Sequence, residues 1–561
     1  MIRRKILPYT FLILAFSLFS SKTFAQLTLP NPILSGFYPD PAICKVGSDY
    51  YVVNSTFSFF PGLPVLHSKD LKNWRQIGSV ITRPSQMDFM GESVSRGLFA
   101  PAINYHNGLF YVTCTDIDNG GNFVVTAKNP AGPWSDPVYI KQVRGIDPSL
   151  FFDDNKAYII YNSNPPDNKS LSGGHRTLRM YEFDPVNLKV LGEETLLVNG
   201  GVDISKKPVW IEGPHIYKRE GWYYLMAAEG GTAVNHSEVV LRSKNPRGPY
   251  IAYDKNPILT QRHLDPNRKN PITSTGHADL VEGPDGKTYA IFIAVRPYEG
   301  DYYNTGRETF IAPVKWIDGW PIINPDSEEV LYQYPVSWKE HKFKNSIPLN
   351  GNFNYKFDFK VDTLNAEFLF LRTNNANWYS LQKRKNYLTM NLIPETIMET
   401  GNPSFLGKRQ QHLTSEAVVE MDFSAKQDNE KAGLIIFQNE THFYYICKSI
   451  SKDKEVIQLF KSNPKTKAMD LLKETSFNEP VKKIYLKINS NKDKYSFSYA
   501  TKKNTWQILE KDLDGKFLST RVAGGFVGAL YGMYTTSSGL KSNNEAQFKW
   551  FNYSGNDETF K

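Results

Sequence analysis

One short pattern recurs five times within the first 330 residues of the 561-residue chain, and it limits the possible folds more than any other feature. In each copy the first residue is followed by a short, largely apolar segment and a polar turn, and a tyrosine stands eleven positions after the first residue. The copies start at Asp40, Ala100, Asp147, Glu212 and Ala278, and their tyrosines are Tyr51, Tyr111, Tyr158, Tyr223 and Tyr289. This spacing fits a strand, a tight turn and a second strand.

The distance between copies indicates how large each unit is. Successive starts lie 60, 47, 65 and 66 residues apart, which leaves room for a four-stranded antiparallel sheet and its loops. Repeats of this size are typical of sheets that are arranged radially. We therefore predict an all-β fold in which residues 26–330 form a five-bladed β-propeller.

The repeat stops after residue 330, and a different β pattern replaces it. Apolar and polar residues alternate in short stretches such as "YKFDFKVD" (355–362) and "KAGLIIFQ" (431–438), which Lys-rich turns separate. Period-two alternation is typical of strands that bury one face. We expect residues 331–561 to form a second domain, a β-sandwich of two packed antiparallel sheets.

The first 25 residues have the features of a signal peptide. A basic start is followed by an apolar run at 6–19 and by a small residue, Ala25, at the expected cleavage site. We expect an exported protein, periplasmic or extracellular, that has no membrane association once the signal is removed. Removal of the four basic residues of this segment lowers the formal net charge from +9 to +5, and so small an excess does not favour nucleic acid as a partner.

The three cysteines, Cys44, Cys114 and Cys447, are too few for a disulfide framework. We expect them to be small buried apolar residues. A bridge between Cys44 and Cys114 is the alternative.

Acidic residues open three of the five repeat copies. In a propeller the first strand of each blade lines the central channel, so Asp40, Asp147 and Glu212 should gather at one mouth, together with His277. Asp147 and Glu212 belong to neighbouring blades, and their proximity should raise the pKa of Glu212, while Asp40 lies opposite. A protonated acid facing an ionised base suits glycoside hydrolysis, and a wide gap between them favours inversion at the anomeric carbon.

Three segments carry a resemblance to a known family. "GFYPDPAI" (36–43), "GIDPSLFFDD" (145–154) and "WIEGPHIYK" (210–218) resemble the signature segments of glycoside hydrolase family 43. Its members are inverting β-xylosidases, α-L-arabinofuranosidases and arabinanases built on a five-bladed propeller. The resemblance implies that Asp40 is the general base, Asp147 the residue that tunes and orients the acid, and Glu212 the general acid.

The same resemblance implies a set of substrate-binding residues. Phe57 matches an aromatic residue of the sugar site, and Arg296 matches an arginine that binds substrate hydroxyls. His277 matches a histidine on the propeller axis, beside a water or a metal ion such as Ca²⁺, and no cofactor is required. Phe99 stands where the family commonly has a tryptophan, which puts the sugar preference in question. "PSFLGKRQQH" (403–412) and "AGGFVGALYGMY" (523–534) resemble a concanavalin-like jelly roll that contributes Phe526 to the wall of the active site.

Each residue also has a purely structural interpretation. Asp40 and Asp147 precede prolines, as in many turns; His277 could be a hydrogen-bonded core histidine; and Arg296 could pair with a carboxylate.

The sequence as a whole favours an exo-acting inverting glycoside hydrolase. It would release terminal β-D-xylose or α-L-arabinofuranose from xylan or arabinoxylan oligosaccharides. The alternative is a non-catalytic propeller-sandwich protein that binds glycans. The oligosaccharide or polysaccharide is the expected partner, and the oligomeric state stays open.

Overall fold

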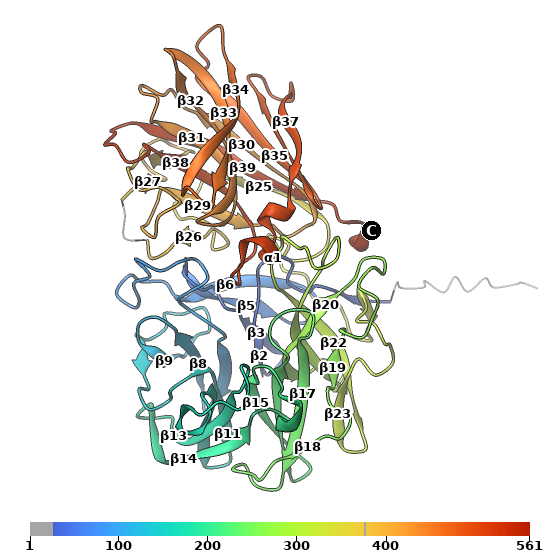
Figure 1. The fold of residues 1–561 in the computed structure, drawn as a ribbon. Coiled ribbons are helices and arrows are strands. Elements are labelled where there is room, and N and C mark those ends of the chain that lie inside the picture. The colour runs from blue at the N-terminus through green and yellow to red at the C-terminus, as the bar shows by residue number, and fades with distance from the viewer. Residues whose placement is uncertain (1–25, 375–376) are drawn as a thin grey trace, which may run out of the picture.

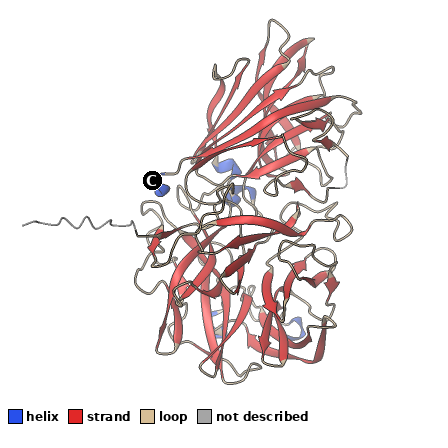
Figure 2. Ribbon diagram, turned by 180° about the vertical axis from the view of Figure 1, so that it is seen from behind, coloured by secondary structure: helices blue, strands red, loops and turns tan. Residues whose placement is uncertain are grey.

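The computed structural model describes residues 26–374 and 377–561, so the predicted signal peptide lies outside the described residues. Strands dominate the described chain (Figure 2). Its helices are all short, namely α1 (Thr520–Ala523) and the 3-10 turns η1 (Pro166–Asn168), η2 (Ile204–Lys206), η3 (Lys516–Leu518) and η4 (Glu558–Phe560). In the described part of the chain no helix has the length and apolar character needed to span a bilayer.

The first half forms five antiparallel sheets that follow one another along the chain. The first sheet contains β2 (Ala42–Val46), β3 (Asp49–Val53), β5 (Gly62–Ser68) and β6 (Trp74–Ile81). The second contains β7 (Ala102–His106), β8 (Leu109–Asp116), β9 (Gly121–Ala127) and β10 (Val138–Tyr139). The third contains β11 (Ile146–Asp153), β12 (Lys156–Ser163), β13 (Thr177–Asp184) and β14 (Lys189–Asn199). The fourth contains β15 (Glu212–Arg219), β16 (Trp222–Glu229), β17 (Ser237–Ser243), β18 (Ile251–Ala252) and β19 (Leu259–Thr260). The fifth contains β20 (Thr273–Glu282), β21 (Thr288–Val295), β22 (Glu308–Ile317) and β23 (Trp320–Ile323).

The innermost strands of these sheets close a ring. β2 contacts β7, β7 contacts β11, β11 contacts β15, β15 contacts β20, and β20 returns to β2. The five sheets are therefore the blades of a propeller, and the start of each innermost strand points to the same mouth. The predicted all-β propeller is confirmed.

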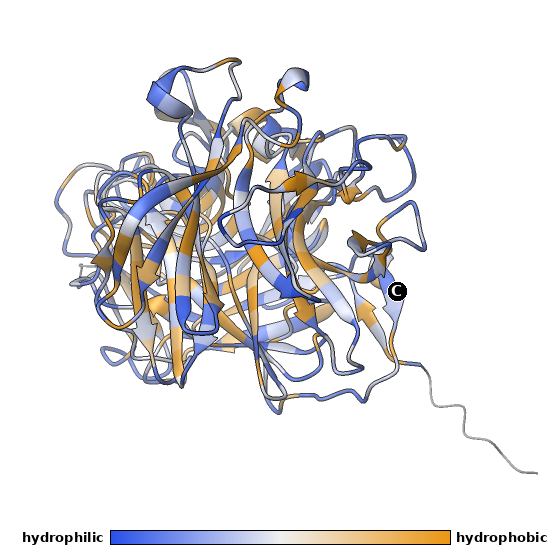
Figure 3. Ribbon diagram, turned by 90° about the horizontal axis from the view of Figure 1, so that it is seen from below, coloured by the Kyte–Doolittle hydropathy of each residue, from blue (hydrophilic) through white to orange (hydrophobic). Residues whose placement is uncertain are grey.

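Aromatic packing between the blades explains the tyrosines of the repeat. Four of the five are buried, and Tyr51 is half-buried. Tyr223, for example, meets Phe151 of the preceding blade edge-on, with ring centroids 6.0 Å apart. Middle strands such as β21 are apolar along almost their whole length because neighbouring blades cover both of their faces. Hydrophilic residues gather in the connecting loops (Figure 3).

The second half is a β-sandwich, as predicted. Its first sheet contains eight strands, β25 (Phe353–Asp358), β27 (Tyr379–Ser380), β28 (Leu388–Asn391), β30 (Thr414–Asp422), β35 (Lys483–Asn491), β36 (Lys494–Ala500), β37 (Gln507–Asp514) and β39 (Glu545–Gly555). Its second sheet contains six strands, β29 (Phe405–Arg409), β31 (Lys431–Asn439), β32 (His442–Ser451), β33 (Lys454–Asn463), β34 (Ala468–Ser476) and β38 (Leu530–Thr536).

The sandwich lies against the mouth side of the propeller, with α1 at the junction (Figure 1). Two short strands, β4 (Phe59–Phe60) of the propeller and β26 (Phe370–Leu371) of the second half, pair directly across it. The change of architecture falls between β23 and β25, and the predicted boundary at residue 330 lies in this interval. The mouth is therefore enclosed by both halves of the chain.

All three cysteines are free thiols, so the alternative of a bridge between Cys44 and Cys114 is wrong. Cys114 and Cys447 are buried and Cys44 is half-buried, as expected of small apolar residues in strands.

The N-terminal segment completes the propeller from outside the repeat. β1 (Thr28–Pro30) pairs with β24 (Gln333–Pro335). The fully buried Asn31 donates through Nδ2 to the carbonyl oxygens of Ile311 and Leu331, 2.8 Å each, and its Oδ1 accepts from the Ile311 amide at 2.8 Å. This side chain therefore joins the start of the chain to the fifth blade.

We predict that Asn31→Ala lowers the free energy of unfolding by about 2–3 kcal/mol, because it leaves buried backbone groups unpaired. Denaturant unfolding measures the change. Asn267→Ala, at an exposed position, serves as the matched control. Equal stability of the two variants would contradict this role of Asn31.

Candidate active site

The residues that open the repeat copies do come together. Asp40 lies just before β2, Asp147 near the start of β11, Glu212 at the start of β15 and His277 in the middle of β20. All four line one cavity of about 340 Å³ at the mouth of the propeller. All four are nearly buried, so the cavity holds three carboxyl groups that are largely removed from water.

The backbone is irregular where the side chains turn into the cavity. Asp40, Asp147 and His277 have positive φ angles of 49°, 55° and 54°. The strand register shifts between Ile146 and Ser149 and again between Glu212 and His215. Bulges of this kind redirect a side chain, and residues other than glycine keep a left-handed conformation only where the surroundings enforce it. The fold thus accepts local strain to aim these groups at one point.

Asp40 forms a buried ion pair with an arginine. Arg307 donates through its two terminal nitrogens to Oδ1 and Oδ2 of Asp40, at 2.7 and 3.2 Å. The Ser55 hydroxyl donates to Oδ2 at 2.6 Å. A two-pronged arginine contact favours the charged form and fixes the plane of the carboxylate.

Asp147 and Glu212 have the opposite electrostatic environment. Burial and the nearby Asp40 charge raise the pKa of Asp147 from its ordinary 3.8 to about 7. Burial, followed by the charges of Asp147 and Asp40, raises the pKa of Glu212 well above its usual range. The predicted influence of Asp147 on Glu212 is present, but burial is the larger cause. The pocket therefore pairs one charged carboxylate with carboxyl groups that tend to keep their protons.

Three phenylalanines form one wall of the cavity. The ring of Phe57 lies 5.6 Å from that of Phe99 and 5.8 Å from that of Phe526, measured between centroids. Phe526 belongs to the sandwich half and follows α1, and its backbone amide donates to the Ser95 hydroxyl of the propeller at 3.0 Å. The expected contribution of the second domain to the pocket is thus present.

His277 lines the cavity as a neutral ring. Burial lowers the pKa of His277 to about 3 and that of neighbouring His236 to about 4. The ring packs on Gly213, where a Cβ atom would lie 2.6 Å from Nε2 of His277. No group of three or more His, Cys, Asp or Glu able to hold a metal ion occurs in residues 26–374 and 377–561. The metal ion expected beside His277, such as Ca²⁺, stays a prediction.

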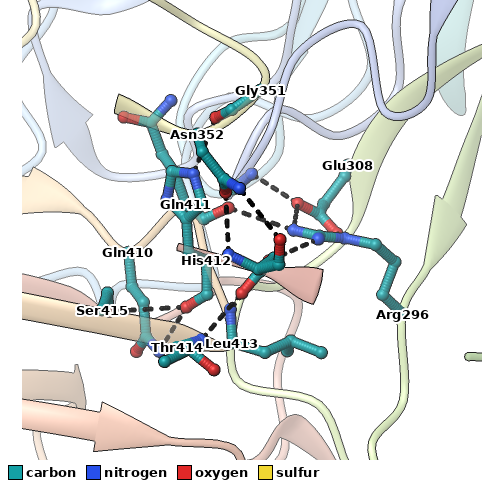
Figure 4. Close-up of polar contacts among 12 residues, drawn as sticks. Arg296, Glu308, Gly351, Asn352, Gln410, Gln411, His412, Leu413, Thr414 and Ser415 are labelled. Atoms are coloured by element: carbon teal, nitrogen blue, oxygen red, sulfur yellow. Dashed lines mark hydrogen bonds and ion pairs between the residues drawn. The ribbon is translucent and has the colours of Figure 1, made fainter. Parts of the chain in front are cut away.

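The expectation for Arg296 is corrected by the structure. Arg296 does not line the cavity; it is buried between the two halves of the chain, where it contacts Glu308 and the Gln411 carbonyl (Figure 4). It also contacts Asp557. Arg307 is the arginine of the pocket. Both arginines lie in the connection between β21 and β22, and the partners that distinguish them, Asp557 and Asp40, are too distant in sequence for spacing to identify.

Sequence reasoning also missed several residues of the rim. Trp210, Val209, Thr232 and His236 all line the cavity. Trp210 has a positive φ of 57°, and the guanidinium of Arg176 lies 4.6 Å from its ring centroid. Its position two residues before Glu212 was the available signal, since a short bulged segment brings both side chains to the same opening.

A propeller that presents three buried carboxyl groups in a small, aromatic-walled cavity defines a glycoside hydrolase. Residues 29–321 match the sequence model of glycosyl hydrolases family 43, and residues 356–554 match that of the beta xylosidase C-terminal concanavalin A-like domain. The chain belongs to glycosyl hydrolase family 43.

Individual relatives agree over nearly the full length. A xylosidase/arabinosidase of Butyrivibrio fibrisolvens is 38% identical over 93% of this chain and 98% of its own. A non-reducing end alpha-L-arabinofuranosidase of Bacteroides ovatus is 35% identical over 94% of this chain and 95% of its own. The crystal structure of a xylan beta-1,4-xylosidase from Bacillus halodurans superposes with a TM-score of 0.85 at 30% identity, and covers 94% of this chain and all of its own.

The raised pKa of Asp147 predicts a pH-dependent stability. Between pH 4 and 7 the folded protein keeps a proton that the unfolded chain releases, so the free energy of unfolding falls as pH rises, by at most about 1.4 kcal/mol per pH unit. The Asp147→Asn variant has no carboxyl group to titrate at this position, so this loss of unfolding free energy does not occur in it. The variant should therefore gain stability over the natural protein as pH rises through this window.

Denaturant unfolding across this pH range measures the difference, with Asp136→Asn, at an exposed carboxyl, as the control. A constant difference between Asp147→Asn and the natural protein would show that Asp147 titrates normally.

Proposed function

We propose that the protein is an exo-acting, inverting glycoside hydrolase that releases terminal β-D-xylose or α-L-arabinofuranose from xylan or arabinoxylan oligosaccharides. The observation that carries this proposal is the division of charge in the cavity. Arg307 pairs with the Asp40 carboxylate through two hydrogen bonds, whereas burial raises the pKa of Glu212 well above its usual range. An ionised base and a protonated acid in one pocket are what glycosidic cleavage needs.

The residues then have distinct roles. Glu212 donates its proton to the glycosidic oxygen as the bond to the anomeric carbon breaks. Asp40 accepts a proton from a water molecule, whose oxygen attacks the anomeric carbon from the opposite face. Asp147 helps to keep Glu212 protonated until substrate arrives. One water is consumed, and the two carboxyl groups regain their starting states when Asp40 returns its proton to solvent and Glu212 takes one up.

The size of the cavity supports an exo-acting enzyme. About 340 Å³ is at the small end for ligand pockets, and Phe526 from the sandwich closes one side. A terminal sugar enters such a pocket more readily than an internal one. The names of the relatives cover xylosidase and arabinofuranosidase activity, so we propose both pentoses as substrates.

Three further expectations belong to the proposal. The first 25 residues direct export, so the enzyme acts in the periplasm or outside the cell. No step of the proposed reaction uses a metal ion, and Glu212, Asp40 and water supply every proton that moves. Oligosaccharides or polysaccharides are the partners; we propose no association with nucleic acid or membrane.

A proton NMR time course on xylobiose and on an arabinosylated xylo-oligosaccharide tests the function. We expect α-D-xylose or β-L-arabinofuranose as the first anomer formed, because the attacking water inverts the anomeric carbon. First appearance of the retained anomer would refute the roles given to Asp40 and Glu212. Saturable sugar binding without any release would favour the glycan-binding alternative.

Replacement of the proposed acid should affect substrates unequally. Glu212→Gln should lower kcat/KM on xylobiose by roughly 10²–10⁴, since a sugar leaving group needs the proton. The loss on nitrophenyl glycosides should be smaller because nitrophenolate leaves without protonation. Glu282→Gln, at an exposed residue paired with Lys45, is the control and should retain full activity. Equal losses on both substrates would argue against Glu212 as the acid.

A further inference from the structure

Arg296, which does not reach the cavity, is the centre of a buried polar network between the two halves of the chain (Figure 4). Its guanidinium donates to both carboxylate oxygens of Glu308, at 2.6 and 2.8 Å. It also donates to Oδ2 of Asp557 at 2.8 Å and to the Gln411 carbonyl at 3.0 Å. One side chain thus contacts the fifth blade, the sandwich and the last residues of the chain.

Asp557 belongs to a six-residue tail after β39, and this tail is firmly docked. The Asp557 side chain is only 4% exposed and accepts hydrogen bonds from the Leu413 and Thr414 amides, at 3.2 and 2.8 Å. Its backbone exchanges two hydrogen bonds with the side chain of Asn352. The ring of Phe560 lies 5.3 Å from the Arg296 guanidinium. These contacts hold the segment after β39 against Arg296 and against the sandwich.

The other side of the network leads to the active site. Oε1 of Glu308 accepts a hydrogen bond of 2.6 Å from the backbone amide of Gly36. Gly36 has a φ of +86°, and a Cβ atom there would lie 2.8 Å from the Gln410 carbonyl oxygen, so only glycine fits. The segment that starts at Gly36 ends at Asp40, four residues later.

Glu308 is also the immediate neighbour of Arg307, which binds Asp40 from the start of β22. Glu308 therefore anchors both the backbone segment that carries Asp40 and the backbone that carries its cation. A displacement of Glu308 moves the two partners of this ion pair relative to each other.

We propose that Asp557, Arg296 and Glu308 form a relay of positioning residues through which the C-terminal tail holds Asp40 in its working geometry. Asp557 fixes Arg296, Arg296 fixes Glu308, and Glu308 fixes the Gly36–Asp40 segment beside Arg307. Asp557 is then a positioning residue for the catalytic base, although its side chain does not touch the cavity. This inference rests on the proposed hydrolase function for its kinetic test, but not for its structural test.

The test variant is Asp557→Asn, which has nearly the same shape but removes the charge that faces Arg296. We expect kcat to fall roughly 10- to 100-fold, because small displacements of a catalytic group are costly. KM on nitrophenyl glycosides should change less than about twofold, since the cavity wall is unaltered. Steady-state kinetics measures both values.

Hydrogen-deuterium exchange provides a readout that does not depend on activity. In Asp557→Asn the amides of residues 34–40, which lead into the first blade, should exchange faster than in the natural protein. Strands β31 and β32, in the middle of the second sandwich sheet, should exchange as before. Glu558→Gln, at the exposed neighbouring position, is the matched control and should match the natural protein in both assays.

Arg296→Lys is a second variant, in case Asp557→Asn fails to fold. A single ammonium group cannot contact both oxygens of Glu308 together with Asp557 and Gln411, so kcat and exchange should shift in the same direction. Unchanged exchange at residues 34–40 in the folded variants would overturn the relay, whatever their activity. Unchanged kcat with faster exchange would overturn it as well. A natural protein without hydrolase activity would instead refute the proposed function.

Discussion

The ion pair between Arg307 and Asp40 decides how three buried carboxyl groups share charge in one pocket. Burial disfavours every negative charge, and without a cation all three groups would tend to hold protons. Arg307 contacts the Asp40 carboxylate through two hydrogen bonds. Burial, and then the charge on Asp40, raise the pKa of Asp147, and burial, followed by the charges of Asp147 and Asp40, raises that of Glu212, while Arg307 partly offsets both shifts. Burial and this ion pair together separate a base from an acid among groups of similar intrinsic acidity.

The architecture brings these groups together without any nearby sequence link between them. Innermost strands that start at one mouth bring residues more than 170 positions apart into one cavity, and bulges at Asp147 and Glu212 turn the side chains inward. The sandwich then completes the site. Phe526 closes a wall, and the buried Arg296 network joins the sandwich, the tail and the fifth blade. The second domain therefore contributes a wall residue to the active site and is joined to the propeller beside it.

Much of the fold and of the active site could be predicted from sequence, because both follow largely from local patterns. The repeat, the strands and the convergence of Asp40, Asp147 and Glu212 follow from local patterns and from the symmetry of a ring. The assignment of Phe57, Phe99 and Phe526 to the pocket came from the family resemblance, and all three line the cavity. The sequence assigns Arg296 to the pocket and does not single out Arg307, because the roles of both depend on partners such as Asp557 and Asp40, which lie more than 250 residues away. The strand order of the sandwich, where β30 lies beside β39, is equally nonlocal.

A crystal structure of an Asp40→Asn variant with xylobiose or an arabinosylated oligosaccharide bound would test the division of roles most directly. We predict a terminal pentose inside the propeller mouth, with its glycosidic oxygen within hydrogen-bonding distance of Glu212 and its ring against the phenylalanine wall. We also predict a water site between the substituted side chain at position 40 and the anomeric carbon. A sugar bound outside this cavity, or with its glycosidic oxygen remote from Glu212, would contradict the assignment of acid and base.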